Sequence, residues 1–523
     1  MEDKTKKTTV VEKEPYKIAV IDLGSNSARL VIANVFPGDA THPGHYMIID
    51  ELKEQVRLAQ DMNKDGFLKS PRIAQAVKTL LMFKKLIDSH KVKKTYAFAT
   101  NAVRNAKNQK SFIEEISAVC GFKFSVLSEE EEAIHIYQGV INSLDISKAV
   151  IVDMSGSSFH LIQYNRRNVI NKTNIPFGTM TLNEIFGNDG LDAVTQAKMV
   201  ETYVKNQLEE VAWLAELEPE TQFVGVGGSF RNLARIINLS SRYPVANVHN
   251  FVVETETLNK VYDSITKLDA QKRSKIKGLS SQRSDIFLAA IATIKAFLET
   301  VNCPKITVSR CGLREGVLIN HAAPTTQERP LSEVLWHSVY SNMKHFGINI
   351  RHSEHVHGLS ITLYKQLRVL HKLPRQYVKI LRAAALLHDA GLKVRHNDHN
   401  RHSLYFILNC TINGFTHREQ ILTAFVAHGH CQDEFPIDEW NKYKSILREE
   451  DLAAVLKLGV ILRITEALDR TQNGCVKNIN CDVLGGAVIL KTEVEGDCSL
   501  EIKEALAAGS DFARAYRKNL EII

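Results

Sequence analysis

The sequence contains no long hydrophobic run, no paired cysteine motif and few aromatic residues. No apolar stretch approaches the roughly 18–20 residues that span a bilayer, so we expect no membrane association. Residues 1–14 mix Lys, Thr and Glu without an apolar segment, which predicts a disordered tail and not a secretory signal. The eight cysteines are scattered, with neither a CxxC pair nor zinc-ligand spacing, and this favours reduced thiols in the cytoplasm.

Aromatic residues make up only 7% of the chain, and no motif for DNA or RNA recognition is visible, so nucleic acid is a minor alternative as a partner. The formal net charge of +7 suits a polyanionic ligand, although a charge count does not locate a binding patch. A length of 523 residues, with 44% hydrophobic and 24% charged residues, predicts several ordinary globular domains.

The front half of the chain contains an internal repeat. Residues 17–32 read KIAVIDLGSNSARLVI and residues 148–163 read KAVIVDMSGSSFHLIQ, which places Asp22 over Asp153. Each copy has an apolar strand, an Asp, a turn of small residues and a second apolar strand. We therefore expect two β-hairpins of the same design.

The turns of both hairpins have a composition that suits phosphate. Small residues expose backbone N–H groups, Ser and Asn add side-chain donors, and an Asp at the end of a strand can hold a divalent cation. An ordinary tight hairpin would explain one copy, but two copies in matched register favour a binding site. A third Gly-rich turn follows a strand-like run in residues 223–229, FVGVGGS. Three such loops around one cleft, on two duplicated halves, form the actin-like or ribonuclease-H-like arrangement.

Seven short segments follow one another along the chain: 22–27 (DLGSNS), 99–106 (ATNAVRNA), 128–133 (SEEEEA), 225–229 (GVGGS), 278–279 (GL), 283–285 (RSD) and 312–316 (GLREG). In this order they resemble the exopolyphosphatase and guanosine pentaphosphatase family over nearly the whole chain. The resemblance implies that Glu132 is the catalytic base, that Arg104 meets phosphate, and that Asp22 and Asp153 hold Mg²⁺ or Mn²⁺. It also implies phosphate-binding roles for Gly24, Ser25, Asn26, Ser27, Thr100, Asn101, Gly156, Ser157, Ser158, Gly227, Gly228 and Ser229.

The second loop departs from the family pattern. The family has Asp-x-Gly-Gly-Gly-Ser-Thr-Glu, whereas residues 153–160 read DMSGSSFH, so that His160 stands where the family has an acid linked to metal or water handling. An imidazole cannot supply the negative charge that suits Mg²⁺. Serine in place of glycine would also restrict the turn wherever a positive φ is needed. The departure favours weakened catalysis.

From about residue 330 the pattern changes to long amphipathic helices. His352, His388-Asp389 and Asp469 resemble the H…HD…D constellation of HD-type phosphohydrolases, which implies a divalent metal site there; an inherited helical scaffold with satisfied polar groups is the alternative. The loop that carries His399 is polar and favours a solvated or polyanion-facing segment, and we interpret His430 as structural.

The sequence as a whole predicts an α/β protein with duplicated actin-like (ribonuclease-H-like) domains, an all-α HD-type domain and a small α/β appendage. The appendage is expected to contain strands at 487–494 and 498–503 and a closing helix. The predicted boundaries are 1–14 for the tail, 15–135 and 136–325 for the actin-like domains, 326–474 for the HD-like domain and 475–523 for the appendage.

Three functions remain open at this point. The first is metal-assisted release of terminal orthophosphate from inorganic polyphosphate, or of the 5′ phosphate of guanosine pentaphosphate. The second is a regulatory module that binds polyphosphate or guanosine tetraphosphate with weakened catalysis. The third is a phosphohydrolase centred on the HD-type domain. The resemblance also implies a homodimer.

Overall fold

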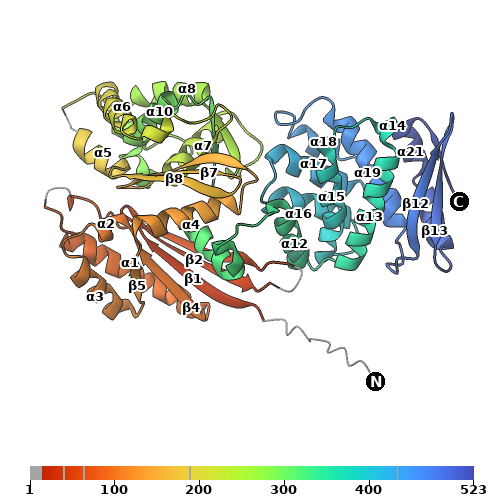
Figure 1. The fold of residues 1–523 in the computed structure, drawn as a ribbon, viewed down its shortest axis with the longest axis horizontal. Coiled ribbons are helices and arrows are strands. Elements are labelled where there is room, and N and C mark those ends of the chain that lie inside the picture. The colour runs from red at the N-terminus through yellow and green to blue at the C-terminus, as the bar shows by residue number, and fades with distance from the viewer. Residues whose placement is uncertain (1–13, 39–41, 63–64, 188–189, 433) are drawn as a thin grey trace, which may run out of the picture. The chain divides into compact units, whose positions relative to one another are not determined.

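The computed structural model describes residues 14–523 except 39–41, 63–64, 188–189 and 433. The chain divides into two compact units, Met1–Ser332 and Glu333–Ile523, called unit 1 and unit 2 below (Figure 1). Nearly all of the predicted tail, 1–14, lies outside the described residues. The finer domain boundaries remain predictions.

The first half of unit 1 is built on a five-stranded sheet in the order β3-β2-β1-β4-β5. β1 and β2 form the first expected hairpin, with Asp22 opposite Arg29, and β4 and β5 continue the sheet in parallel. β1 is apolar on both faces because helices cover both: Ile21 packs with α1 and α3, and Val20 packs with α11. The bounds are β1 Tyr16–Leu23, β2 Ser27–Phe36, β3 His45–Gln55, α1 Ser70–Ser89, β4 Lys94–Ala99, α2 Asn101–Arg104, α3 Gln109–Cys120 and β5 Phe124–Val126.

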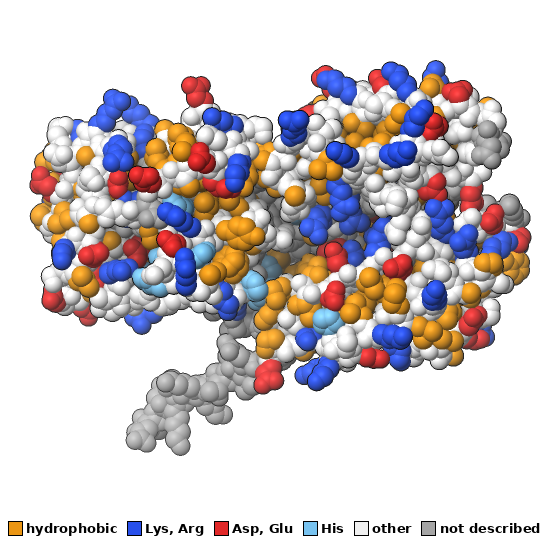
Figure 2. Space-filling model, turned by 180° about the vertical axis from the view of Figure 1, so that it is seen from behind, with side chains coloured by type: hydrophobic (Ala, Val, Ile, Leu, Met, Phe, Trp, Pro, Cys, Tyr) orange, Lys and Arg blue, Asp and Glu red, His pale blue; other side chains and the backbone are white. Residues whose placement is uncertain are grey.

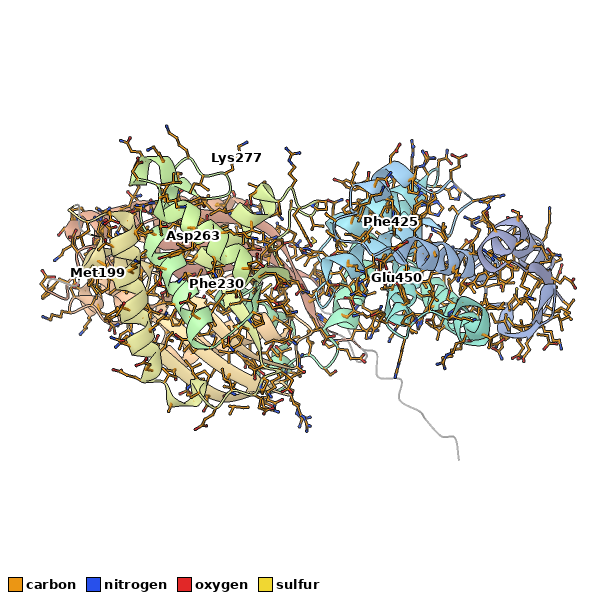
Figure 3. All side chains as sticks on the ribbon, turned by 90° about the horizontal axis from the view of Figure 1, so that it is seen from above. Met199, Phe230, Asp263, Lys277, Phe425 and Glu450 are labelled. Carbon is orange, nitrogen blue, oxygen red and sulfur yellow. The ribbon has the colours of Figure 1, made fainter. Side chains whose placement is uncertain are left out.

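The second half repeats this topology in the sheet β10-β11-β9-β6-β7-β8. β6, β7 and β8 form an antiparallel meander, β9 and β11 continue in parallel, and β10 adds an antiparallel edge. The helices α6, α7, α8 and α10 cover one face, with Phe230 in the shared core (Figure 3). The bounds are β6 Lys148–Met154, β7 Phe159–Asn165, β8 Asn168–Ile175, α5 Thr179–Phe186, α6 Ala193–Glu209, η2 Ala212–Leu214, β9 Gln222–Val226, α7 Gly228–Ser240, β10 Phe251–Glu254, α8 Thr255–Thr266, α9 Ala270–Arg273, η3 Ser281–Arg283, α10 Phe287–Thr300 and β11 Lys305–Val308.

Two helices, α4 (Glu129–Ile141) and α11 (Leu313–Ala322), pack against each other between the sheets (Figure 1). α4 packs on the second sheet and α11 on the first, so each half contributes the helix that covers the other. Glycines allow the close approach: a Cβ at Gly139 would overlap the Gly312 backbone, and one at Gly316 would overlap the His135 carbonyl. The 3-10 helix η4 (Pro324–Gln327) follows α11.

α4 begins where the acidic run predicts a helix start. Ser128 Oγ accepts from the Glu131 N–H at 3.2 Å, and the Glu131 carboxylate accepts from the Ser128 N–H at 2.8 Å. This reciprocal capping box fixes the first turn. It thereby sets the direction of Glu132, whose side chain is buried.

Unit 2 begins with a helical region, as the sequence predicts, and Phe425 lies in its interior (Figure 3). The bounds are α12 Val334–Phe346, α13 Ile350–Gln366, α14 Arg368–His371, α15 Tyr377–Leu387, η5 His388–Lys393, α16 His399–Asn409, α17 His417–His428, α18 Ile437–Asn441 and α19 Asp451–Ala467.

The C-terminal part of unit 2 is a three-stranded sheet with two helices. β12 (Val476–Val483), β13 (Ala487–Val494) and β14 (Asn519–Ile522) form the sheet, and α20 (Ser499–Leu506) and α21 (Gly509–Tyr516) precede its last strand. The strand predicted at 487–494 is confirmed, but the strand predicted at 498–503 is wrong because this segment is mostly α20. α20 packs on α19, a contact that its alternating sequence does not reveal.

Candidate active site

The loops that follow β1, β6 and β9 open onto one cleft in unit 1, with about 750 Å³ of space including its open mouth. The lining contains small residues, four acids and five arginines. They are Asp22, Gly24, Ser25, Asn26, Ser27, Arg29, Thr100, Glu132, Ile136, Asp153, Met154, Ser155, Gly156, Val226, Gly227, Gly228, Arg231, Arg283, Arg310, Gly312, Leu313, Arg314 and Glu315.

The first and second loops contact each other directly. Ser25 Oγ lies 2.5 Å from Ser157 Oγ, and Asn101 Nδ2 donates to both the carbonyl and the hydroxyl of Ser157 at 2.7 Å. The N–H of Gly24 closes the first turn on the Ser27 carbonyl at 3.1 Å. Packing favours glycine at 156, since a Cβ there would lie only 3.0 Å from that of Ser25. The two loops are therefore mutually positioned.

The serines of the second loop cause no backbone strain. Neither Ser155 nor Ser157 has a positive φ. Ser155 Oγ accepts from the N–H groups of Ser157 and Ser158 at 3.2 and 3.0 Å and so stabilises the turn. In the third loop, by contrast, Gly227 has φ of +98°, a conformation that favours glycine. Gly228 then starts α7, whose first N–H groups suit an anion.

Glu132 is held by a cation and lies near His160. Arg104 Nη1 donates to Glu132 Oε2 at 2.9 Å, and to the Leu127 carbonyl at 2.7 Å. His160 Nε2 lies 3.7 Å from Glu132 Oε1, too far for a hydrogen bond, and has no closer partner among the described residues. Burial opposes the charge of both side chains. The attraction between Glu132 and His160, together with that of Arg104 for Glu132, outweighs this effect of burial. The pKa of Glu132 is therefore lowered and that of His160 is raised.

The two hairpin acids lie at the base of the cleft. Burial raises the pKa of Asp22, and it raises the pKa of Asp153 to about 6. Arg29 stands opposite Asp22 and His160 opposite Asp153 in the two hairpins. Ionised together, these carboxylates would require a nearby cation.

The arginines give the cleft its positive character. Burial, reinforced by neighbouring arginines, lowers the pKa of Arg231 to about 9 and that of Arg283 to about 10. Arg283 Nη1 also donates to Ser229 Oγ at 3.3 Å. Lys and Arg side chains gather in the hollow between the two lobes of this unit (Figure 2). The buried arginines repel one another, and a bound polyanion would relieve this repulsion.

The structure brings together the predicted front-site residues. Most line the cleft, whereas Asn101, Arg104, Ser157, Ser158 and Ser229 lie directly behind the lining residues and hold the loops. Their chemical roles remain predictions. Sequence reasoning missed Arg29, Arg231 and Arg310, although the repeat places Arg29 over His160 and could have identified it.

In unit 2, the predicted HD-type residues converge. His352 Nδ1 donates to Asp469 Oδ2 at 2.7 Å, and its Nε2 lies 3.9 Å from Asp389 Oδ2. His388 Nε2 lies 3.6 Å from Asp389 Oδ1. The ligand atoms of His352, His388 and Asp389 all lie within 4.8 Å of one another, close enough to hold one ion.

Two histidines that the sequence placed elsewhere join this cluster. His399 Nε2 lies 3.6 Å from Asp389 Oδ1 and 2.8 Å from His430 Nε2. His399 begins α16 and does not lie in a loop, whereas the structural interpretation of His430 remains a prediction. Burial, with His388 close by, holds the pKa of His430 well below its ordinary range, so its imidazole is neutral.

The duplicated sheets and the small-residue loops define an actin-like protein with an arginine-lined cleft. The chain belongs to the Ppx/GppA phosphatase family, whose profile matches residues 39–324, while the profile of Ppx/GppA phosphatase, domain III, matches residues 335–502. Within the described residues, no helix has the length and apolarity to cross a membrane.

The chain is similar to a guanosine-5'-triphosphate,3'-diphosphate pyrophosphatase of Pseudoalteromonas atlantica, with 26% identity over 464 residues, 87% of this chain and 88% of that protein. A protein of the same name from Aeromonas salmonicida is 26% identical over 471 residues, 88% of this chain and 89% of that protein.

Two solved structures share the fold. A Ppx/GppA family member of Aquifex aeolicus has a TM-score of 0.50 and 28% identity, and the match covers 61% of this chain and 100% of that chain. An exopolyphosphatase from Cytophaga hutchinsonii has a TM-score of 0.54 and 24% identity over 58% of this chain and 97% of that chain. The second likeness bears on the fold alone.

Proposed function

We propose that the cleft of unit 1 releases terminal orthophosphate from inorganic polyphosphate, or the 5′ phosphate from guanosine pentaphosphate. The observation that carries this proposal is the convergence of three small-residue loops, five arginines and the acids Asp22, Glu132 and Asp153 in one cleft. Membership of a phosphatase family and the names of the curated relatives support the same reaction class.

The arginines and loop N–H groups would bind the phosphates and neutralise the charge that develops during transfer. Glu132 would orient and deprotonate the attacking water, because its carboxylate lines the cleft and faces the loops. Arg104 would fix the carboxylate through the 2.9 Å contact. A base with a lowered pKa is ionised at neutral pH, although it is also a weaker proton acceptor.

Asp22 and Asp153 fit a Mg²⁺ or Mn²⁺ ion. Both offer carboxylate oxygens, the donors that these ions prefer, and both have a raised pKa because burial outweighs the attraction of the neighbouring cationic side chains. A bound cation would compensate their charge and polarise the phosphoryl oxygens. The protein's part is to hold the two carboxylates at the ends of β1 and β6.

A second candidate function is a binding or regulatory module for polyphosphate or guanosine tetraphosphate. The position of His160 favours it, since its Nε2 lies 3.7 Å from Glu132 Oε1 and its pKa is raised. An imidazolium beside the base would lower its ability to accept a proton. Binding would then persist while turnover is slow.

We propose further that unit 2 is an HD-type domain in which His352, His388 and Asp389 hold a divalent ion. The Nε2 atom of His388 is buried and has no hydrogen-bond partner among the described residues, which fits a ligand role. Asp469 accepts from His352 Nδ1 and from the Gly474 N–H, so it orients His352. An HD-centred phosphohydrolase is the corresponding third function. The homodimer and the cytoplasmic location remain predictions.

Phosphate release tests the proposal, with polyphosphates of several lengths and guanosine pentaphosphate as substrates, in Mg²⁺, Mn²⁺ or chelator. Glu132→Gln should lower turnover by about 10²–10⁴-fold, the usual contribution of a positioned base. Glu130→Gln is the matched control, because Glu130 is exposed in the same acidic run and pairs with Lys172.

Each outcome selects one function. Loss in Glu132→Gln with full activity in Asp389→Ala supports the cleft, and the reverse pattern supports the HD-centred enzyme. Tight polyphosphate binding by a wild-type protein that releases no phosphate with any metal supports the binding module. Full activity in Glu132→Gln contradicts the proposed role of Glu132.

A further inference from the structure

Four histidines of unit 2 have their Nδ1 atoms committed to hydrogen-bond acceptors. The Nδ1 atoms of His388, His399 and His430 lie 2.8, 2.9 and 2.6 Å from the backbone carbonyls of residues 385, 396 and 427. His352 Nδ1 meets Asp469 Oδ2 at 2.7 Å. A carbonyl or carboxylate oxygen can only accept, so every Nδ1 carries the proton. Each neutral ring therefore presents a lone pair at Nε2.

Three of the four Nε2 atoms lie close to the Asp389 carboxylate, and the fourth, that of His430, lies against the Nε2 atom of His399. His388 and His399 approach Oδ1 at 3.6 Å, and His352 approaches Oδ2 at 3.9 Å. The rings of His388 and His430 are 5.0 Å apart, and those of His399 and His430 are 4.8 Å apart. This orientation of imidazoles by their Nδ1 bonds is typical of metal ligands.

The contact between His399 and His430 requires a cation. Their Nε2 atoms lie 2.8 Å apart, and two lone pairs at that distance repel unless a proton or a metal ion lies between them. The HD-type site proposed above uses neither residue. An additional positive species is therefore needed on this side of Asp389.

Cys431 completes a second set of ligands. Its Sγ lies 3.7 Å from His399 Nε2, and the donor atoms of His399, His430 and Cys431 all lie within 4.8 Å of one another. The guanidinium of Arg463 holds the turn that carries His430 and Cys431, with Nε donating to the Gly429 carbonyl at 3.2 Å and Nη2 donating to the carbonyl of residue 431.

We propose that His399, His430 and Cys431 bind a second metal ion, distinct from the HD-type ion, and that Asp389 bridges the two. Oδ1 of Asp389 lies 3.6 Å from both His388 and His399, and Oδ2 faces His352, so the carboxylate lies between the two sets of ligands and can serve both ions. His399 keeps 15% of its side chain exposed and Cys431 is half-buried, which leaves a route from solvent.

The donors select a late transition metal, above all Zn²⁺. Two imidazoles, a thiolate and a carboxylate are zinc ligands, whereas Mg²⁺ prefers oxygen. Bond lengths of about 2.0–2.1 Å to nitrogen and about 2.3 Å to sulfur give tetrahedral edges of about 3.3 Å between nitrogens and about 3.6 Å from nitrogen to sulfur. The observed 2.8 and 3.7 Å come near these edges, so only small side-chain shifts are needed.

Metal content of the full chain tests the proposal. The protein is stripped with chelator, reconstituted with Zn²⁺ in excess Mg²⁺ to occupy the front cleft, and analysed by mass spectrometry after gel filtration. The double variant His399→Ala/Cys431→Ser should hold about one Zn²⁺ per chain fewer than wild type. Cys410→Ser is the matched control, because Cys410 is a half-buried thiol of the same unit outside the cluster. Equal zinc content in the double variant and wild type would overturn the proposal.

Cobalt provides a readout that does not depend on folding of the double variant. Co²⁺ bound by a thiolate shows a sulfur-to-metal charge-transfer band in the near ultraviolet, in addition to its visible bands. Wild type and Cys410→Ser should show the band, and Cys431→Ser should lose it while keeping visible bands from the HD-type ion. His352→Ala should keep the charge-transfer band. Absence of the charge-transfer band from wild type, or persistence of the band in Cys431→Ser, would refute the site.

Discussion

The two hairpins of unit 1 share one design but differ in the residue that faces the acid. In the first hairpin Asp22 stands opposite Arg29, and in the second Asp153 stands opposite His160. Arg29 lines the cleft, whereas His160 is 1% exposed and faces Glu132. The first hairpin therefore offers a permanent cation to ligand, and the second directs a titratable ring toward the proposed base.

This difference indicates a division of labour within the repeat. An arginine is charged at every physiological pH and suits phosphate binding, while a histidine can gain or lose its charge. Binding should then depend mainly on the first hairpin and turnover mainly on the second. Variants that exchange or neutralise the two residues can test this division.

The largest effect on binding should come from Arg29→Met, which keeps the length of the side chain and removes its charge. A charge-assisted hydrogen bond contributes about 1.5–3 kcal/mol, so the dissociation constant for polyphosphate should rise about 10–100-fold. His160→Gln should leave it nearly unchanged, because His160 does not line the cleft. Both are measured by calorimetric titration in the Glu132→Gln background. Equal losses of polyphosphate affinity in the two variants would contradict the division of labour between the hairpins.

The contact between α4 and α11 offers a second test, since each helix comes from one half and covers the sheet of the other. Gly316→Ala places a methyl group against the His135 carbonyl, and overpacking of this kind should destabilise unit 1 by about 1–3 kcal/mol. Urea denaturation measures the loss.

Gly358→Ala is the control for this substitution. Gly358 lies in α13, and the methyl group of an alanine there would meet no atom within 4 Å, so the change should be neutral or stabilising by up to about 1 kcal/mol. Unchanged stability of Gly316→Ala would show that the helices can separate without loss.

Local patterns were sufficient to predict both hairpins, and the acidic run at 129–132 is typical of a first helical turn such as that of α4. A strand, an Asp and a turn of small residues are encoded within about ten positions, and so is the capping of Ser128 by Glu131. Whether Ser155 and Ser157 restrict the second turn depends on φ, which composition does not give, and the structure shows that neither position has a positive φ.

Long-range pairings could not be predicted from the sequence. Arg231 and Arg310 reach the cleft from α7 and from the segment before α11, and nothing local marks either as a ligand residue. His399 and His430 approach each other only through the packing of unit 2. The segment 498–503 alternates like a strand, yet it forms a helix in which Glu501 is buried and accepts from Thr471.

His160→Glu should have a smaller effect, which is an increase in turnover. It removes the ring that lowers the pKa of Glu132 and adds carboxylate oxygen, which suits Mg²⁺ better than imidazole nitrogen. We expect Mg²⁺-dependent turnover to rise about tenfold, or about 1.4 kcal/mol of barrier. If His160 instead ligates a softer ion, wild-type activity should prefer Mn²⁺ or Zn²⁺ and the variant should shift that preference.

His160→Gln separates the two causes of this increase. It removes the titratable ring without adding a negative charge. A gain in the glutamate variant alone assigns the effect to the added charge, and an equal gain in both assigns it to loss of the ring. A loss of activity in both variants would make His160 necessary for turnover.

The smallest effect concerns Lys53, which neighbours Arg29 across β2 and β3. Burial, together with repulsion from Arg283 and Arg29, lowers the pKa of Lys53 to about 7. Below pH 7 the lysine adds a cation to the first hairpin, and above pH 7 it loses that charge. The inner phosphates of polyphosphate stay ionised throughout this range, and only the two terminal phosphates of each chain titrate. With long chains the change in charge is therefore mainly that of the protein.

Polyphosphate binding should therefore weaken as pH rises from 6 to 8, by a factor of about three to ten, because an exposed or half-buried charge contributes about 1 kcal/mol. Lys53→Met should flatten this dependence and match wild type at pH 8, where both lack the charge. Calorimetric titration at constant ionic strength measures it, since salt would otherwise screen the effect. Arg29→Met serves as the reference, because its loss of affinity for polyphosphate should be the same at both pH values. A wild-type affinity that rises with pH would contradict the expected sign and the proposed role of Lys53.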